Sequence, residues 1–298
     1  MTKAKRLIDS HQHVFWHGKD DRGLVEDMDR FGIEKAWLLT WEELEAETGV
    51  GLRALDPRYR VPGSAITALP LHDVVEACRR YPDRFIPGYC PHPTDPNAQA
   101  KLAAAIDMFG VKVCGEWKSS VLMDDPRAIE LLRFAGSRRL PVVFHLDVPY
   151  LPPNGGRFVG NYSWKGGTIH NLERAMQAAP NTIFIGHGPG FWREMHGEAD
   201  NWGEVYLKPP LAPGGRLLTL FDKYPNLYAD LSAGSALRAL GADPAVARRL
   251  LLAHSDRFLF ARDYYGGDLL DFLNTLDLPE EVWQKIGWEN AERLIGNA

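Results

Sequence analysis

The sequence contains few cysteines, no excess of basic residues and no long apolar run. Its three cysteines, at positions 78, 90 and 114, cannot all pair, and no CxxC or zinc-finger spacing occurs. The formal net charge of −5 offers no basic surface for nucleic acid. The longest apolar stretches, such as 250–253 and 258–261, fall far short of the ~20 residues that cross a bilayer. The basic start has only Leu7 and Ile8 before Asp9, too few for a signal peptide. We therefore expect a reduced, cytoplasmic protein that binds neither nucleic acid nor membranes.

Glycine and proline, by contrast, are abundant. The chain has 28 glycines and 21 prolines among its 298 residues, about 16% against an average of roughly 12%. This excess predicts many tight turns and structured loops. The length suits either two domains of ~150 residues or one large α/β barrel.

Short apolar runs alternate with amphipathic segments along the whole chain. The runs are 7–8, 35–40, 85–89, 111–114, 141–144, 182–185, 227–230 and 258–261, and the helical segments include 71–81, 98–109, 126–138, 168–179 and 245–254. Strands that alternate with helices form a parallel sheet, and eight of them close a (β/α)₈ TIM barrel. A doubly wound open sheet is the alternative, but the first strand leads into Asp9-Ser-His-Gln-His rather than a glycine-rich phosphate turn. We predict one barrel domain over residues 1–298.

Three segments that follow strands are long. They are residues 41–68, 147–167 and 188–215, after the second, fifth and sixth strands, and they are rich in Gly, Pro, Trp and Arg. Loops beyond ~12–15 residues in compact domains usually bind or cover something. These loops belong to the C-terminal face, where barrel enzymes place their sites.

Histidines and one aspartate fall at the ends of the predicted strands. In His11-Gln-His13, two imidazoles two residues apart on a strand face the same side. His145 ends the fifth strand, His187 the sixth and Asp263 the eighth. Each histidine alone is explained by a hydrogen bond in the core. Together they supply the imidazoles and carboxylate that Zn²⁺ or a similar ion prefers, so we predict a metal site.

These motifs resemble those of a known enzyme superfamily. The stretch Ile8-Asp9-Ser-His11-Gln-His13, the strand-end residues His145, His187 and Asp263, and the ending 286–294 are similar to the amidohydrolase superfamily. The match is best to its amidohydrolase-related branch, which includes aminocarboxymuconate-semialdehyde-decarboxylase-like enzymes. The resemblance covers essentially the whole chain and implies a metal-bearing barrel with hydrolase or decarboxylase chemistry. We expect one or two divalent ions, Zn²⁺ or alternatively Mn²⁺.

The sequence departs from the family pattern at two places. Many members carry a carboxylated lysine at the end of the fourth strand, where this chain has Glu116 and Lys118. We favour Glu116 as the ligand or bridge and Lys118 as a cation for the substrate. In addition, Arg262 precedes Asp263, where the family more often has a small residue, and the sequence leaves its direction open.

The expected reaction is metal-assisted hydrolysis of a C–N, ester or lactone bond. Asp263 would move the proton of an activated water, and His187 would bind the metal or polarise the carbonyl. Decarboxylation of an aromatic or unsaturated carboxylate is the alternative, and a metal-free lactonase is a further one. Decarboxylation needs a cationic clamp, for which the candidates are Arg53, Arg157, Arg193, Lys118 and Lys165.

Substrate contacts are expected from the long loops and the strand ends. For a small aromatic or carboxylated molecule, the predicted substrate-binding residues are Lys118, Trp16, Trp117, His92, Arg157 and Trp192. Tryptophans concentrated in these loops suggest flat apolar walls, although they can equally pack the loops onto the barrel. The insertion after the sixth strand is expected to form a lid or a contact within a homodimer.

Overall fold

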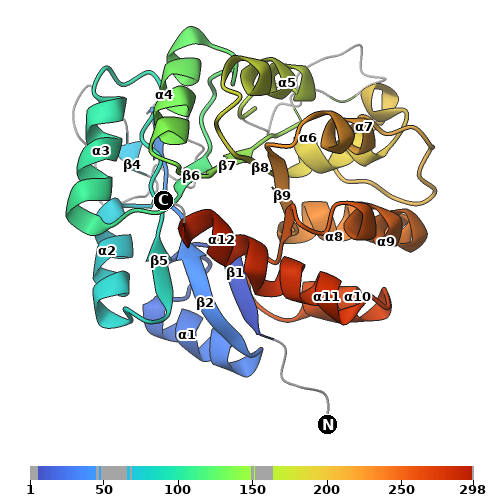
Figure 1. The fold of residues 1–298 in the computed structure, drawn as a ribbon, viewed down its shortest axis with the longest axis horizontal. Helices are drawn as coiled ribbons and strands as arrows, with labels where there is room; N and C mark the ends of the chain where they lie inside the picture. The colour runs from blue at the N-terminus through green and yellow to red at the C-terminus, as the bar shows by residue number, and fades with distance from the viewer. Residues whose placement is uncertain are drawn as a thin grey trace.

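The structure is a computed structural model, and it describes residues 6–44, 47, 66–67, 69–148, 151 and 164–296. Eight parallel strands alternate with helices that lie around their outside (Figure 1). The strands are β1 (Leu7–Gln12), β2 (Ile33–Leu38), β5 (Phe85–Pro87), β6 (Cys114–Trp117), β7 (Val142–His145), β8 (Phe184–His187), β9 (Leu227–Asp230) and β10 (Phe258–Leu259). The helices are α1 (Asp21–Arg30), α2 (Leu71–Arg80), α3 (Ala98–Phe109), α4 (Pro126–Ser137), α5 (Ile169–Ala178), α6 (Pro189–Trp192), α7 (Arg216–Lys223), α8 (Ala233–Ala242), α9 (Pro244–Ala253), α10 (Asp268–Thr275), α11 (Glu280–Gln284) and α12 (Asn290–Gly296).

The strands form a TIM barrel, as predicted. One parallel sheet has the order β1-β2-β5 and the other the order β10-β9-β8-β7-β6. A parallel bridge between Gly88 and Val113 joins them on one side. On the other side Ser10 N donates to Phe260 O at 3.0 Å. A two-stranded antiparallel ribbon, β3 (Glu42–Glu43) with β4 (Ile66–Thr67), follows β2.

The strand residues divide into an inner and an outer layer. The inner cluster includes Ile8, Trp37, Leu39, Val113, Val143, Ile185, Tyr228 and Leu259, one or two from each of seven strands or their ends. Their chain neighbours, such as Phe144 and Phe184, join the larger cluster that also contains residues of the surrounding helices. α12 crosses the centre of the ring in Figure 1, and its Ala291 and Leu294 belong to the inner cluster. Apolar side chains therefore fill the barrel below the strand ends.

The predicted helices agree with the structure to within one residue at each end. The third of them begins as expected, because Asp125 caps α4 by accepting a hydrogen bond from Arg127 N at 2.9 Å. Among the helices of the described residues, none is long and apolar enough to span a membrane.

Most of the predicted strands are shifted, shortened or extended at one end or both. The second runs over Ile33–Leu38, the fourth over Cys114–Trp117, and the last ends at Leu259. The fourth was wrong because apolar residues mark burial rather than backbone pairing. β6 begins only after Val111 and Val113 and extends to Trp117, which pairs with Phe144 of β7. As a result, Glu116 lies within a strand of the barrel wall.

Candidate metal centre

Five side chains converge at the carboxyl ends of the strands. Nε2 of His13 lies 3.2 Å from Asp263 Oδ1 and 3.6 Å from Glu116 Oε2. Nε2 of His11 lies 3.7 Å from the same Asp263 oxygen and 3.9 Å from Glu116 Oε2. Nε2 of His187 lies 3.5 Å from Asp263 Oδ2. Two overlapping groups could each hold an ion: His11 with His13 and Asp263, and His11 with Glu116 and His187.

A second set of acceptors fixes the orientation of the imidazoles. His11 Nδ1 lies 2.7 Å from Asp230 Oδ2, and His187 Nδ1 lies 3.1 Å from Asp230 Oδ1. His13 Nδ1 lies 2.9 Å from the Leu39 carbonyl oxygen. With the proton of each ring on Nδ1, the Nε2 lone pairs point to the centre. Within the described residues, Nε2 of His11 and of His13 is buried and has no hydrogen-bond partner. Buried polar atoms of this kind require an explanation, and a metal ion supplies one.

The carboxylates make the centre favourable for positive charge. Burial raises the pKa of Asp263 and Asp230, but the adjacent imidazoles outweigh it and hold both pKa values well below the usual range. Burial lowers the pKa of His11, but Asp263 and Asp230 raise it to about 9. Either a proton or a metal cation can balance the negative charge of these carboxylates, and the two compete for Nε2 of His11.

His145, also predicted as a ligand, lies between two carboxylates. Its Nδ1 lies 2.9 Å from Glu116 Oε1, and its Nε2 lies 3.0 Å from Asp147 Oδ1. Burial lowers the pKa of His145, whereas Asp147 and Glu116 raise it, to about 9. Both ring nitrogens are thus engaged by carboxylates, and His145 holds Glu116 in place instead of joining the two ligand groups. The position of His145 at the strand end was predicted correctly, but the sequence does not show which atoms its ring nitrogens contact.

Lys118 and two tryptophans line one side of the centre. Lys118 Nζ lies 3.4 Å from Glu116 Oε2 and 4.8 Å from the centroid of the Trp41 ring. The His13 ring is 5.2 Å from Trp41 and 5.8 Å from Trp16, measured between centroids. The Lys118 side chain is 21% exposed, and Trp16 is half-buried. Lys118 and Trp16 are the two predicted substrate contacts that the structure brings to the centre.

The other predicted substrate residues lie elsewhere. Trp117 is buried in the outer cluster, because its side chain points away from the barrel interior that Glu116 faces. Trp192 is also buried in that cluster, with its ring 5.4 Å from Phe191. His92 is fully buried, with Nε2 3.3 Å from Glu47 and Nδ1 2.9 Å from the Thr94 hydroxyl. Arg157 and Arg53 fall outside the described residues.

Two further cations considered for a clamp are already paired. Lys165 Nζ lies 2.9 Å from Glu43 Oε1, and both side chains are 3% exposed. Arg193 Nη2 donates to the carbonyl oxygens of Ala199 and Trp202, at 2.5 Å and 3.0 Å. Among the clamp candidates that the structure describes, Lys118 is therefore the one beside the metal centre.

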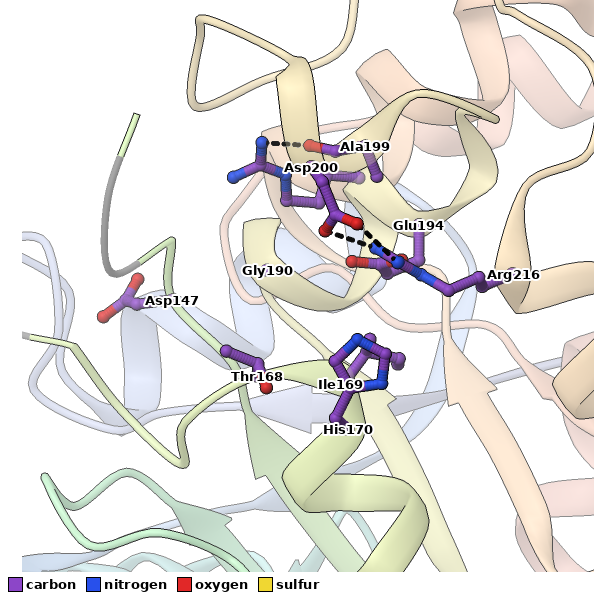
Figure 2. A pocket seen from close by; sticks show the side chains of 10 residues that line it. Asp147, Thr168, Ile169, His170, Gly190, Glu194, Ala199, Asp200 and Arg216 are labelled. Atoms are coloured by element: carbon purple, nitrogen blue, oxygen red, sulfur yellow. Dashed lines mark hydrogen bonds and ion pairs between the residues drawn. The ribbon is translucent and has the colours of Figure 1, made fainter. Parts of the chain in front are cut away.

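A pocket of about 190 Å³ lies near His145, between the insertion after β8 and residues that follow β7 (Figure 2). Asp147 lies on one side of it and Arg216 on the other. Arg216 bonds both oxygens of Asp200 at 2.8 Å and Glu194 at 2.6 Å, so these charges satisfy one another. Asp147, which lines this pocket, contacts His145 and so connects the pocket with the centre.

Asp230 is a site residue that our sequence analysis missed. It ends β9 after Leu-Tyr-Ala, which is the same signal that identified Asp263: a carboxylate terminating a buried apolar strand. Its carboxylate bridges His11 and His187, and it also accepts a 2.6 Å hydrogen bond from Ser232 Oγ.

The whole barrel matches one enzyme family. Residues 8–296 fit the sequence profile of the family described as amidohydrolase. The chain belongs to the amidohydrolase family. This family is metal-dependent, in agreement with the unpartnered imidazole nitrogens of the centre. A search of curated protein sequences found no significant match.

Several solved structures share the fold at low sequence identity. A 2,6-dihydroxybenzoate decarboxylase from Rhizobium is 19% identical over 98% of both chains, with a TM-score of 0.61. A dihydroxybenzoic acid decarboxylase from a Polaromonas species, with bound manganese and 2-nitroresorcinol, is 17% identical over 98% of this chain and 97% of that one, with a TM-score of 0.60. A Pseudomonas putida protein, provisionally a 2-pyrone-4,6-dicarboxylic acid hydrolase, is 16% identical over 98% and 97%, with a TM-score of 0.58.

Proposed function

We propose that this protein is a metal-dependent hydrolase of a small, ring-containing carboxylated molecule, cleaving an ester, lactone or C–N bond. The observation that carries the proposal is the pair of buried, unpartnered Nε2 atoms of His11 and His13 directed at Asp263 and Glu116. A divalent cation bound by these groups would lower the pKa of a water from ~15.7 to roughly 7–9 and polarise a carbonyl. Zn²⁺ suits the imidazole and carboxylate donors, and Mn²⁺ is the alternative.

Asp263 is the group that we assign to proton transfer. Its side chain is 17% exposed, against 1% or less for those of His11, His13, Glu116 and His187, so it is the member of the set that a substrate can reach. Asp263 would accept a proton from the attacking water and return it to the leaving group. Because Nδ1 of His187 faces Asp230, its Nε2 is an acceptor, which favours a ligand role over polarising a carbonyl by hydrogen-bond donation.

Decarboxylation is the second candidate, and the position of Lys118 is compatible with it. An ammonium group beside both the centre and the face of Trp41 suits a planar carboxylate held against an aromatic wall. Two of the solved structures of this fold are named as decarboxylases of dihydroxybenzoates. Both reactions place a carboxylate near Lys118, so they differ in product rather than in binding.

Product analysis separates the two reactions. The protein, loaded with Zn²⁺ or Mn²⁺, would be incubated with 2,6-dihydroxybenzoate and with 2-pyrone-4,6-dicarboxylate, measuring CO₂ release and opening of the pyrone ring. Ring opening that is lost on chelation and in Asp263→Asn supports the hydrolase, and CO₂ release supports the lyase. Activity that survives both chelation and Asp263→Asn contradicts the metal-dependent proposal.

A further inference from the structure

The barrel closes at a seam between β1 and the segment that carries Asp263. Asp263 N donates to His11 O at 2.9 Å, and Gln12 Nε2 donates to Tyr264 O at 2.6 Å. Three of the candidate ligands, His11, His13 and Asp263, stand on the two sides of this seam. The distance between these ligands therefore depends on how the two segments are held together.

Arg262 ties the two segments together through its side chain. Its Nε donates to Asp9 Oδ2 at 2.7 Å, and its backbone N donates to Asp9 Oδ1 at 2.9 Å. Asp9 is two residues before His11 and is fully buried. Nη1 of Arg262 donates to Asp27 Oδ2 at 2.6 Å, and Asp27 also accepts a hydrogen bond from Lys19 Nζ at 3.0 Å. Two cations and two carboxylates thus form one connected chain from α1 to the seam.

The backbone at the seam determines which way the ligand side chains point. The register of β1 against β2 shifts between Asp9 and Gln12, so strict alternation is interrupted there. As a result Asp9 meets Arg262 in the outer layer, while His11 meets Asp230 in the inner one. In the segment that follows β10, Asp263 has φ of 53°, a left-handed conformation that its hydrogen bond to His11 O and the fixed Arg262 maintain.

We infer that Arg262 is a positioning residue for the metal centre, acting through Asp9 on His11 and through the backbone on Asp263. The inference rests on the proposed function, because it concerns the geometry of the proposed ligands. Arg262 is 6% exposed and contacts none of the proposed ligand side chains in the described structure. Its guanidinium fork matches two separate carboxylates, a geometry that lysine cannot reproduce.

The inference is tested by loading the full-length protein with Co²⁺, using Arg262→Met, Arg262→Lys and Arg257→Met. Arg257 is the matched control, since it bonds the Phe221 and Tyr224 carbonyls at 2.6 Å and 3.1 Å, away from the centre. We expect Arg262→Met to weaken Co²⁺ affinity by about 10–100-fold, the usual effect of losing a partner of a ligand, and to change the visible spectrum. Arg262→Lys should fall between wild type and Arg262→Met. Arg257→Met should lower the thermal midpoint but leave affinity and spectrum unchanged.

Two results would overturn the inference. One is a folded Arg262→Met or Arg262→Lys protein with the affinity and spectrum of wild type. The other is an equal loss of affinity in Arg257→Met, which would show general destabilisation. Should Arg262→Met fail to fold, Arg262→Lys and Asp27→Asn carry the comparison. Wild-type protein that binds no Co²⁺ is a separate outcome: it contradicts the proposed function, and this inference falls with it.

Discussion

At the scale of single residues, function depends on which atom of each side chain faces the centre. His11 and His13 were predicted as ligands because their spacing on a strand places both on one face, and the structure directs both Nε2 atoms to Asp263. His145 was predicted as a ligand because it ends a strand, but its ring lies between two carboxylates. Sequence position predicts the strand end at which a side chain lies, whereas its partners depend on neighbouring strands that the sequence does not specify.

Asp230 allows a direct test at this scale. Asp230→Asn keeps the shape but removes the charge that orients His11 and His187, so we expect metal affinity to fall about 10–100-fold. The measurement is competition with a coloured chelator. Asp243→Asn is the control, because that aspartate caps α9 by accepting from Val246 N and bonds none of the imidazoles of the centre among the described residues. Unchanged affinity in Asp230→Asn would contradict the orienting role.

Lys118 supports a second prediction for a single residue. Lys118→Met removes the cation beside Glu116 and keeps an apolar stem against Trp41. We expect KM for a carboxylated substrate to rise by about tenfold or more, since charged hydrogen bonds contribute ~1.5–3 kcal/mol. Steady-state kinetics on carboxylated and neutral esters of similar size make the comparison. An equal change for both substrates would argue against carboxylate recognition.

At the scale of elements, close contacts between strands and helices position the ligands. The sequence predicted the order of strands and helices because apolar periodicity records burial. It did not predict that β6 extends to Trp117, nor that the register of β1 shifts between Asp9 and Gln12. Both irregularities lie at the metal centre, and both depend on pairing with a neighbouring strand rather than on local sequence.

Gly186 on β8 illustrates such a contact. Gly186 immediately precedes His187. A Cβ atom at Gly186 would lie 2.3 Å from two ring atoms of Phe191 in α6. We expect Gly186→Ala to lower the free energy of unfolding by about 1–3 kcal/mol through overpacking, with partial recovery in Gly186→Ala/Phe191→Leu. Gly234→Ala in α8, where the nearest atom is 4.0 Å away, should instead be neutral or stabilising. Chemical denaturation measures all three, and equal stability of the two alanine variants would refute the packing argument.

At the scale of the whole molecule, the barrel brings acids and imidazoles together in a buried layer that requires positive charge. Because a proton on His11, with its pKa raised to about 9, competes with the metal, binding must release that proton. Apparent Mn²⁺ affinity should therefore rise by roughly tenfold per pH unit from about pH 7 and level off near pH 9. The test is to titrate the protein with Mn²⁺ in non-chelating buffers between about pH 7 and pH 9. An affinity that does not change with pH would show that His11 carries no competing proton.

The most direct test of the metal centre is elemental analysis of the purified protein after incubation with Zn²⁺ or Mn²⁺ and removal of free ions. The account predicts one or two bound ions per chain in wild type, and a substoichiometric amount in a folded His11→Ala/His13→Ala variant. A folded wild-type protein that retains neither metal, or a double variant that retains as much as wild type, would contradict it.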